Sequence, residues 1–257
     1  MRKHFAISAG TAAVAVIVSL VVAPSPARSQ QPAAQAKGKG PGRAAPPPGP
    51  SGPTPHMPDG KPDFTGIWNG QRTVSQDGPY LQPWAQKLLD QRETNHYADD
   101  FEARCLPGGP PRAAPYHTAL VSTPKLVLML FEGNTHMFRQ FFLDGTDHPK
   151  DLKPTWYGDS RAHWDGETLV VDTIGFNDKS WIDMPGHPHT SQMHLTERFS
   201  RPNLGTLNIG ITIDDPGAYT KPWIQSRTAT LETSIEMTEY VCNENNQDPV
   251  HLDGAHK

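Results

Sequence analysis

Hydrophobic and charged residues are both scarce in this 257-residue chain. Hydrophobic residues make up 35% of it and charged residues 19%, against roughly 45–50% and 25% in ordinary globular proteins. Proline, by contrast, occurs 27 times, about twice its usual share of roughly 5%. We therefore expect part of the chain to lie outside the hydrophobic core and the remainder to form one domain.

Cysteine and basic charge are scarce as well. Cys105 and Cys242 are the only cysteines, which excludes a disulfide-dense miniprotein and any four-cysteine zinc or iron–sulfur site. Beyond residue 29 the chain has 20 basic and 27 acidic residues, a net charge of −7, so no nucleic-acid partner is expected. Glycine-rich nucleotide-binding motifs, the H-E-x-x-H zinc motif and the G-x-S-x-G hydrolase motif are also absent from the sequence.

The first 29 residues have the features of a secretory signal peptide. Basic residues Arg2 and Lys3 precede an apolar run over residues 5–23, and the small residues of Ala27-Arg28-Ser29 precede Gln30. We expect cleavage before Gln30 and export to the periplasm or medium, with no membrane span left in the mature chain. An uncleaved anchor is the alternative, but Ser, Thr and Gly interrupt the apolar run.

A Pro/Gly-rich stretch follows the signal peptide, with ten prolines between residues 30 and 63. Such a stretch cannot bury enough apolar surface to offset the entropy lost on ordering. We predict a disordered linker over residues 30–57 and a β-rich domain over residues 58–257. Outside the reducing cytoplasm two cysteines are more often paired than free, so we expect a Cys105–Cys242 disulfide that closes a loop of 137 positions.

Helical periodicity is confined to residues 83–104, whereas the prolines and glycines of residues 105–112 predict an irregular loop. From residue 125 onward, short strands alternate with tight turns, among them a type I′ turn at Asp165-Gly166. At least six strands without helices between them favour a mainly β fold. We predict one antiparallel β-barrel (lipocalin-like) or a sandwich, with one N-terminal helix.

Glu197 is the first candidate for chemistry, because strand alternation places it on the same face as Leu195 and Phe199. A carboxylate among hydrophobic side chains is either paired with a cation or kept neutral by a raised pKa, as proton transfer near neutral pH requires. Arg139 and Arg198 are the candidate cations. The sequence leaves the catalytic and the purely structural alternatives open.

Three histidines lie close together before this strand: His187, His189 and His194. Their imidazoles could bind a divalent metal ion, the one cofactor that the sequence suggests. The candidate oxygen ligands are Glu197, Asp178 and Asp183. Alternatively, His189 acts as a general acid and base, with Asp183 fixing its tautomer, and His187 is a solvated loop residue.

Two further candidates, Arg139 and His148, flank the predicted Asp144-Gly145 turn. Arg139 could bind an anionic or carboxylate group of a substrate as well as Glu197. His148 adds a titratable side chain whose ordinary pKa lies close to neutral pH. We include both among the candidate catalytic residues.

Three sequence motifs occur together in this chain: PDGKPDFTGIW at residues 58–68, WDGETLVVDTIGFND at 164–178 and PHTSQMHLTER at 188–198. By these motifs the chain resembles a widespread family of secreted, β-rich bacterial proteins. The likeness extends over nearly all of residues 58–245 and includes both cysteines. It implies a single exported β-rich domain, and it implies no particular activity.

Together these features predict an exported enzyme that acts on a small, partly hydrophobic or aromatic molecule by hydrolysis, elimination or isomerisation. Glu197 and His189 would transfer protons, Asp183 or Asp178 would orient groups or hold a metal, and Arg139 would bind an anion. Two alternatives stand beside it. The barrel could carry a hydrophobic ligand in an apolar lumen without catalysis, or form an envelope-associated structural domain with an exposed aromatic surface.

Overall fold

The computed structural model describes residues 49–70, 73–112, 117–133, 138–244 and 246–248. The expected signal peptide, residues 1–29, and residues 30–48 of the expected linker lie outside these ranges. Residues 46–257 belong to one compact unit.

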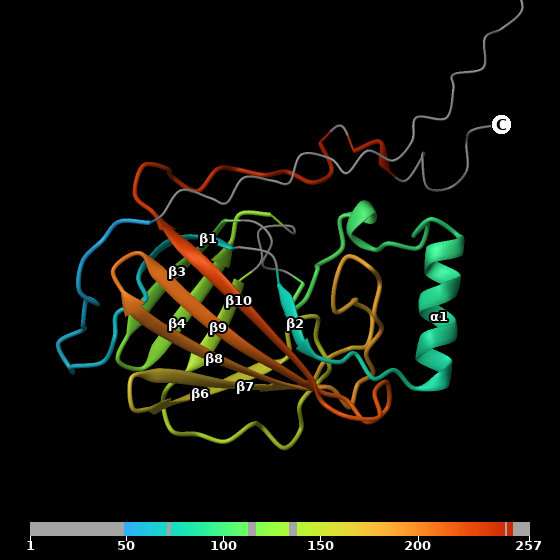
Figure 1. The fold of residues 1–257 in the computed structure, drawn as a ribbon, viewed down its shortest axis with the longest axis horizontal. Coiled ribbons are helices and arrows are strands. Elements are labelled where there is room, and N and C mark those ends of the chain that lie inside the picture. Colours follow the sequence, from blue (N-terminus) through green and yellow to red (C-terminus); the bar gives the residue numbers. More distant parts are fainter. Residues whose placement is uncertain (1–48, 71–72, 113–116, 134–137, 245, 249–257) are drawn as a thin grey trace, which may run out of the picture. The chain divides into compact units, whose positions relative to one another are not determined.

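The described residues form ten strands, one α-helix and one short 3-10 helix (Figure 1). The strands are β1 (Gly66–Gly70), β2 (Val74–Asp77), β3 (His117–Thr123), β4 (Leu126–Phe131), β5 (Phe138–Phe142), β6 (Asp159–Asp165), β7 (Thr168–Ile174), β8 (His194–Asn203), β9 (Thr206–Asp214) and β10 (Trp223–Glu232). The helices are α1 (Pro83–Thr94) and the 3-10 helix η1 (Glu102–Arg104).

Nine of these strands close into a barrel, in the order β1-β3-β4-β5-β6-β7-β8-β9-β10 with β10 paired back to β1. Strand β2 pairs with the first half of β10 and stays outside the ring. The barrel prediction is confirmed over the sandwich. The expectation of a purely antiparallel sheet is wrong at one place, because β5 and β6 are parallel. Residues 143–158 form a long connection that brings the chain back beside the last residues of β5, where Phe141 pairs with Ser160 at the start of β6.

The barrel wall follows the predicted alternation of inward and outward side chains. On β8, Leu195, Glu197 and Phe199 are buried on the inner face. The predicted hairpin between β6 and β7 is present, but its turn residues are Gly166 and Glu167, because Asp165 still pairs with Thr168 on β7. The type I′ turn expected at Asp165-Gly166 is wrong, since it needs positive φ at both central residues and only Gly166, at +61°, has one. Aromatic rings from opposite parts of the wall fill the interior, such as Phe141 and Phe199 with ring centroids 5.6 Å apart.

The predicted helix over residues 83–104 is shorter in the structure. Helix α1 starts with Pro83 in its first turn, as expected, and ends at Thr94. Two positive φ angles, at His96 and Tyr97, then turn the chain away from the helix axis. Tyr97 therefore contacts the ring of Trp181, at a centroid distance of 6.4 Å, and does not extend the helix face.

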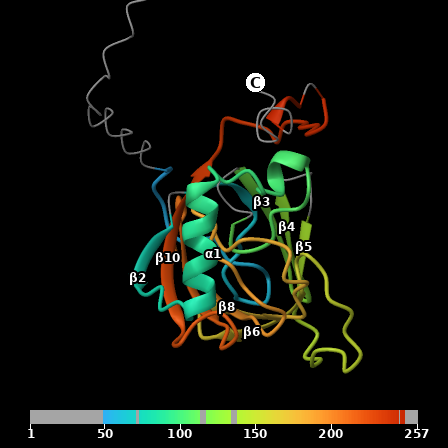
Figure 2. The ribbon, with the colours of Figure 1, turned by 90° about the vertical axis from the view of Figure 1, so that its right-hand side faces the viewer.

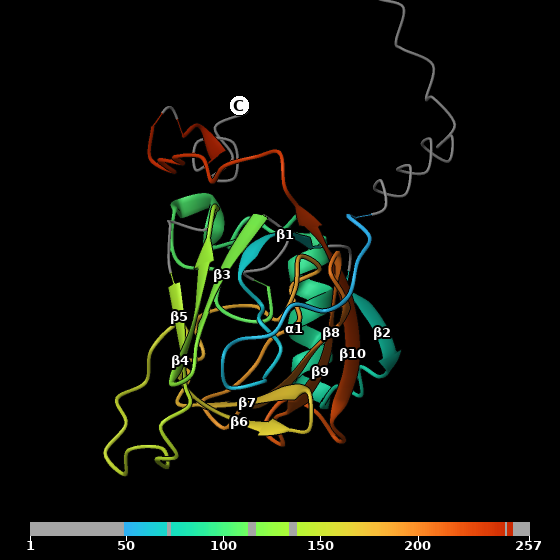
Figure 3. The ribbon, with the colours of Figure 1, turned by 90° about the vertical axis from the view of Figure 1, so that its left-hand side faces the viewer.

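Different segments cover the two ends of the barrel. Helix α1, residues 99–112 and residues 176–192 lie at one end, where β6, β8 and β10 begin (Figure 2). Residues 49–65 lie at the other end (Figure 3). This segment includes the last part of the expected linker, which packs against the β8–β9 turn. The hydroxyl of Thr54 donates to the carbonyl of Arg201 over 2.8 Å, and the amide of Leu204 donates to Gly52 over 3.0 Å.

The chain after β10 returns along the outside of the barrel toward η1 (Figure 1). Strand β10 ends at Glu232, and the residues that follow it bind elsewhere. The amide and hydroxyl of Thr238 both donate to Glu132, which follows β4, over 3.0 and 2.8 Å. The Cys105–Cys242 disulfide predicted from the sequence is present, with Cα atoms 5.6 Å apart. Within the described ranges, none of the helices has the length and apolar character needed to cross a membrane.

Candidate functional site

A buried ion pair lies inside the barrel, toward the α1 end. A guanidinium nitrogen of Arg139 on β5 lies 2.6 Å from a carboxylate oxygen of Glu197 on β8, and their side chains are only 2% and 6% exposed. The same nitrogen lies 3.2 Å from the hydroxyl of Thr173 on β7 and 3.5 Å from that of Ser160 on β6. Four neighbouring strands thus contribute one polar side chain each to this interior ion pair and its surroundings.

Of the two cations proposed for Glu197, the structure selects Arg139. Arg198, the next residue along β8, points outward and lies 2.6 Å from Asp165 at the exposed β6–β7 turn. Strand alternation explains the choice, because adjacent residues on β8 face opposite sides of the wall. Removing two charges from water is costly unless they meet in good geometry, so the interior ion pair keeps its place only while both partners remain.

An irregular segment, residues 106–112, covers the α1 end of the barrel, and we call it the Pro–Gly loop. Its residues 108–112 are all buried. Gly109 has a φ of +68°, and a Cβ at this position would lie 2.7 Å from the hydroxyl oxygen of Ser180 and 2.9 Å from the carbonyl oxygen of Trp156. Only glycine fits so close an approach. The loop is the irregular one expected from the sequence, and its buried position was not predicted.

A second buried polar pair lies on one side of Gly109. The hydroxyl oxygen of Ser180 and Nε2 of His189 are 2.8 Å apart, and Nδ1 of His189 lies 3.1 Å from the carbonyl oxygen of Thr190. A carbonyl only accepts, so Nδ1 carries the proton and Nε2 accepts from the Ser180 hydroxyl. Burial lowers the pKa of His189 below its ordinary value, although the Thr190 carbonyl opposes this change. His189 is therefore a neutral imidazole at neutral pH.

Tyr157 borders Gly109 as well. Its hydroxyl lies near the Gly109 backbone without forming a hydrogen bond of ordinary geometry. Burial raises the pKa of this phenol, and the Gly109 backbone and the Arg139 charge partly offset the rise. The Pro–Gly loop thus touches both the Ser180–His189 pair and the surroundings of the interior ion pair.

A buried arginine of β10, Arg227, holds the far part of the Pro–Gly loop. Its guanidinium donates to the carbonyl oxygen of Pro111 over 3.1 Å and to the hydroxyl of Thr73 over 3.0 and 2.6 Å. Burial lowers the pKa of Arg227 to about 10, while the charge of Glu197 acts in the opposite direction. The loop therefore contributes backbone atoms to a region lined by ionisable side chains.

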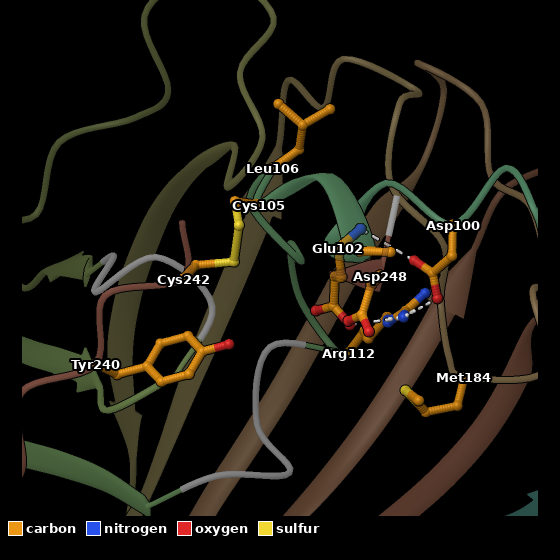
Figure 4. A pocket seen from close by; sticks show the side chains of 10 residues that line it. Asp100, Glu102, Cys105, Leu106, Arg112, Met184, Tyr240, Cys242 and Asp248 are labelled. Atoms are coloured by element: carbon orange, nitrogen blue, oxygen red, sulfur yellow. Dashed lines mark hydrogen bonds and ion pairs between the residues drawn. A yellow bond between two sulfur atoms is a disulfide. The ribbon is translucent and has the colours of Figure 1, made fainter. Parts of the chain in front are cut away.

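Two cavities of the described region are a small one inside the barrel and a larger one at its periphery. One of about 20 Å³ lies inside the barrel beside Arg227 and Trp68, room for about one water molecule. Another of about 200 Å³ lies between the ends of the Pro–Gly loop and the C-terminal segment (Figure 4). It is lined by Asp100, Glu102, Ala103, Cys105, Leu106, Arg112, Met184, Tyr240, Cys242 and Asp248. Neither cavity is lined by Glu197 or His189.

The three histidines suggested as metal ligands face different partners. His187 Nδ1 lies 2.8 Å from a carboxylate oxygen of Asp183, His189 binds Ser180, and His194 contacts Asp172 on the outer face of β7. Across the described ranges, no three His, Cys, Asp or Glu side chains form a group suited to a metal ion. The expected His189–Asp183 pair is likewise not formed, because Asp183 binds the neighbouring His187.

The remaining candidates lie away from the interior. Asp178 is exposed and has a φ of +57°. His148 belongs to a cluster on the outside of the barrel, with Nδ1 2.7 Å from Asp159 and Nε2 3.0 Å from Asp172. Burial raises the pKa of Asp159, but hydrogen bonds from Arg161 and His148 outweigh this and the net pKa is lowered. The structure therefore separates His148 from Glu197 and His189.

Several residues of the interior were missed from the sequence. Arg227 could have been found from the sequence, because strand alternation places it on the inner face of β10 with Gln225 and Ala229, as it places Glu197 on the inner face of β8. Ser180 and Tyr157 had none, since both lie in irregular segments whose path depends on distant contacts. No protein-family model, curated protein or solved structure matches this chain.

Proposed function

We propose that this protein is an exported enzyme that transforms a small, partly hydrophobic molecule by acid and base chemistry beneath the Pro–Gly loop. The reaction class is hydrolysis, elimination or isomerisation, since each needs a positioned proton acceptor and a polar group for developing charge. His189 is the base, and the Arg139–Glu197 ion pair of the barrel interior supplies the polar group.

The proposal depends above all on the buried Ser180–His189 pair beside Gly109. A neutral imidazole that accepts from a hydroxyl is an arrangement that activates nucleophiles and moves protons. The carbonyl of Thr190 fixes the imidazole tautomer, a role that carboxylates fill in other sites of this kind. Burying polar groups costs free energy of folding. Apolar residues, which fill the neighbouring core, would not have this cost, so the buried pair is better explained by a function than by stability.

A substrate reaches these groups only when the Pro–Gly loop moves outward, because Gly109 lies against the Ser180 hydroxyl and the Pro111 carbonyl accepts from Arg227. Closure of the loop over a bound molecule would then exclude water from the reaction. Both alternatives have less support. An apolar carrier needs a lumen larger than the 20 Å³ cavity, and the aromatic surface expected from Trp156, Trp181 and Trp223 is not formed, because Trp181 and Trp223 are buried.

The experiment is a substrate screen on protein purified from the periplasm of a bacterial host. Small aryl esters, β-hydroxy acids and enolisable ketones are incubated with wild type and with His189→Gln, and products are followed by proton NMR. A general base contributes roughly 100-fold or more to rate, so His189→Gln should lose at least that factor.

The matched control is His187→Gln, which alters a neighbouring histidine that binds Asp183 on the same segment. It should keep turnover within twofold. Equal turnover by wild type and His189→Gln would contradict the proposal, and tight retention of a hydrophobic compound without turnover would favour the carrier. Elemental analysis of the same protein tests the divalent metal ion expected from the sequence.

A further inference from the structure

Arg227 is the buried cation of the barrel interior that the acid and base chemistry does not use. It lies on the inner face of β10 with 8% of its surface exposed. Across the sheet it pairs in register with Ile209 on β9, which itself pairs with Phe199 on β8. A charged group therefore lies in an otherwise apolar part of the wall.

The contacts of Arg227 are uncharged, unlike those of two other buried arginines. Arg139 contacts Glu197, and Arg112 contacts both Asp100 and Glu102 over 2.7 and 2.6 Å. Arg227 instead donates to the Thr73 hydroxyl and the Pro111 carbonyl. A buried cation is strongly stabilised by an anion in direct contact. In the described residues the hydrogen bonds of Arg227 go only to neutral oxygens, and Glu197 acts on it through its charge without a direct contact.

The surroundings of Arg227 also limit what kind of anion could bind. The adjacent 20 Å³ cavity is lined mainly by hydrocarbon, including Trp68, Leu120 and Leu207. An inorganic anion would lose its hydration shell against these apolar walls without compensation. A molecule with a carboxylate at one end and a hydrocarbon body would meet both requirements.

The Pro–Gly loop already places an oxygen where such a carboxylate would bind. The Pro111 carbonyl oxygen accepts a hydrogen bond from the Arg227 guanidinium over 3.1 Å. This acceptor is neutral, whereas a carboxylate in its place would be charged. A carboxylate forms shorter and roughly twofold stronger hydrogen bonds with a guanidinium. It can therefore displace the loop carbonyl, and the loop movement that admits a ligand also frees its binding group.

We propose that Arg227 is a carboxylate-binding residue and that the barrel takes small monocarboxylates with an apolar aliphatic or aromatic body. This deepens the proposed function, on which it rests for the opening of the Pro–Gly loop, by naming the substrate class. Its test measures binding alone, so the two can fail separately.

The test compares matched probes by isothermal titration calorimetry: octanoate with octanamide, and phenylacetate with phenylacetamide. Wild type should bind at least one carboxylate ten or more times more tightly than its amide. Arg227→Met should lose this preference, and Arg227→Lys should keep part of it, because lysine retains the charge but not the planar fork. Arg198→Met, which removes an exposed arginine of β8, should behave as wild type.

The outcomes separate the two proposals. Equal binding of acid and amide, or no binding of either pair, overturns the carboxylate site, whatever the substrate screen shows. Carboxylate binding that requires Arg227, together with no turnover in any assay, supports the site and counts against the enzyme. Should Arg227→Met fail to fold, the wild-type comparison of acid with amide and the Arg227→Lys variant still decide the question.

Discussion

The two ends of the barrel are closed by different chemistry. At the β6–β7 end, Phe64 is fully buried, stacks on Trp164 at a centroid distance of 5.7 Å and contacts Phe199 at 6.5 Å. At the α1 end, the backbone of Gly109 and Pro111 faces buried ionisable side chains. Irregular segments contribute to the cover at both ends, so the two ends differ in the residues that these segments pack against the barrel interior.

Burial of aromatic rings and burial of ionisable side chains have opposite effects on the stability of the fold. An aromatic ring buried among other rings stabilises the fold by removing apolar surface from water and needs no further explanation. A buried imidazole, phenol and guanidinium each cost free energy when the chain folds, and replacing buried charges by apolar residues often stabilises a protein. The Phe64 end also buries a guanidinium, that of Arg201, but it donates to the backbone carbonyl oxygens of Asp63 and Leu204 and so helps to hold that end closed. The buried imidazole and phenol lie at the α1 end, which is where the proposed function is placed.

The largest expected effect concerns the disulfide that anchors the start of the Pro–Gly loop. Replacing Cys105 and Cys242 together by serine should lower the free energy of unfolding by about 5 kcal/mol, because a cross-link over 137 positions strongly restricts the unfolded chain. Urea unfolding followed by tryptophan fluorescence measures the loss. Wild type treated with a reductant should match the double variant.

Hydrogen exchange of the same double variant compares the local stability of the two ends. Amides of residues 99–112 should lose protection, while those around Phe64 should change only as global stability changes. Equal extra loss at both ends would mean that the disulfide does not act on the α1 end in particular.

The second prediction concerns the interior ion pair. Glu197→Leu should cost about 4 kcal/mol, because it leaves the Arg139 guanidinium buried without its partner, whereas the double variant Arg139→Met/Glu197→Leu should recover most of that loss. A double-mutant cycle by urea unfolding measures the coupling. Phe64→Ala should cost a similar amount, since it leaves a cavity, and no second substitution at the α1 end should rescue it.

The control for this cycle lies one residue away on β8. Arg198 and Asp165 form an ion pair whose side chains are 49% and 63% exposed, and breaking an exposed pair costs less than about 1 kcal/mol. A loss in Arg198→Met as large as that in Glu197→Leu would show that burial is not what makes the interior pair important.

Local sequence pattern predicted the parts of the structure that local rules govern. The alternation of Leu195, Glu197 and Phe199 predicted the inner face of β8, and Gly166 predicted the β6–β7 hairpin, although its turn lies one residue later than expected. Both depend on residues close together in the chain. The same alternation turns Arg198 away from Glu197, whereas the contact between Arg139 on β5 and Glu197 on β8 depends on the order of four strands and could not be read from local pattern.

Non-local contacts decided what the sequence left undetermined. His189 could not be matched to Ser180, because the segment between β7 and β8 folds back on itself and gives Asp183 to His187 instead. The parallel β5–β6 pair could not be foreseen either, since the path of residues 143–158 is fixed by where β6 packs. The Pro–Gly loop was recognisable as irregular, but its insertion toward buried ionisable groups depends on Arg227 and Ser180, both distant in sequence.

The smallest expected effect tests the burial of His189 through the pH dependence of stability. In the unfolded chain its pKa is about 6.5, and burial lowers the pKa in the folded protein. The unfolded state thus binds the proton first as pH falls. The stabilisation from neutral His189 is complete above about pH 6.5 and is lost below it, with a slope of at most about 1.4 kcal/mol per pH unit.

His189→Gln should lack this component between pH 6.5 and 5, measured as the difference in unfolding free energy from wild type, whereas His187→Gln should keep it. A wild-type slope that His189→Gln leaves unchanged would show that this imidazole is not buried in solution.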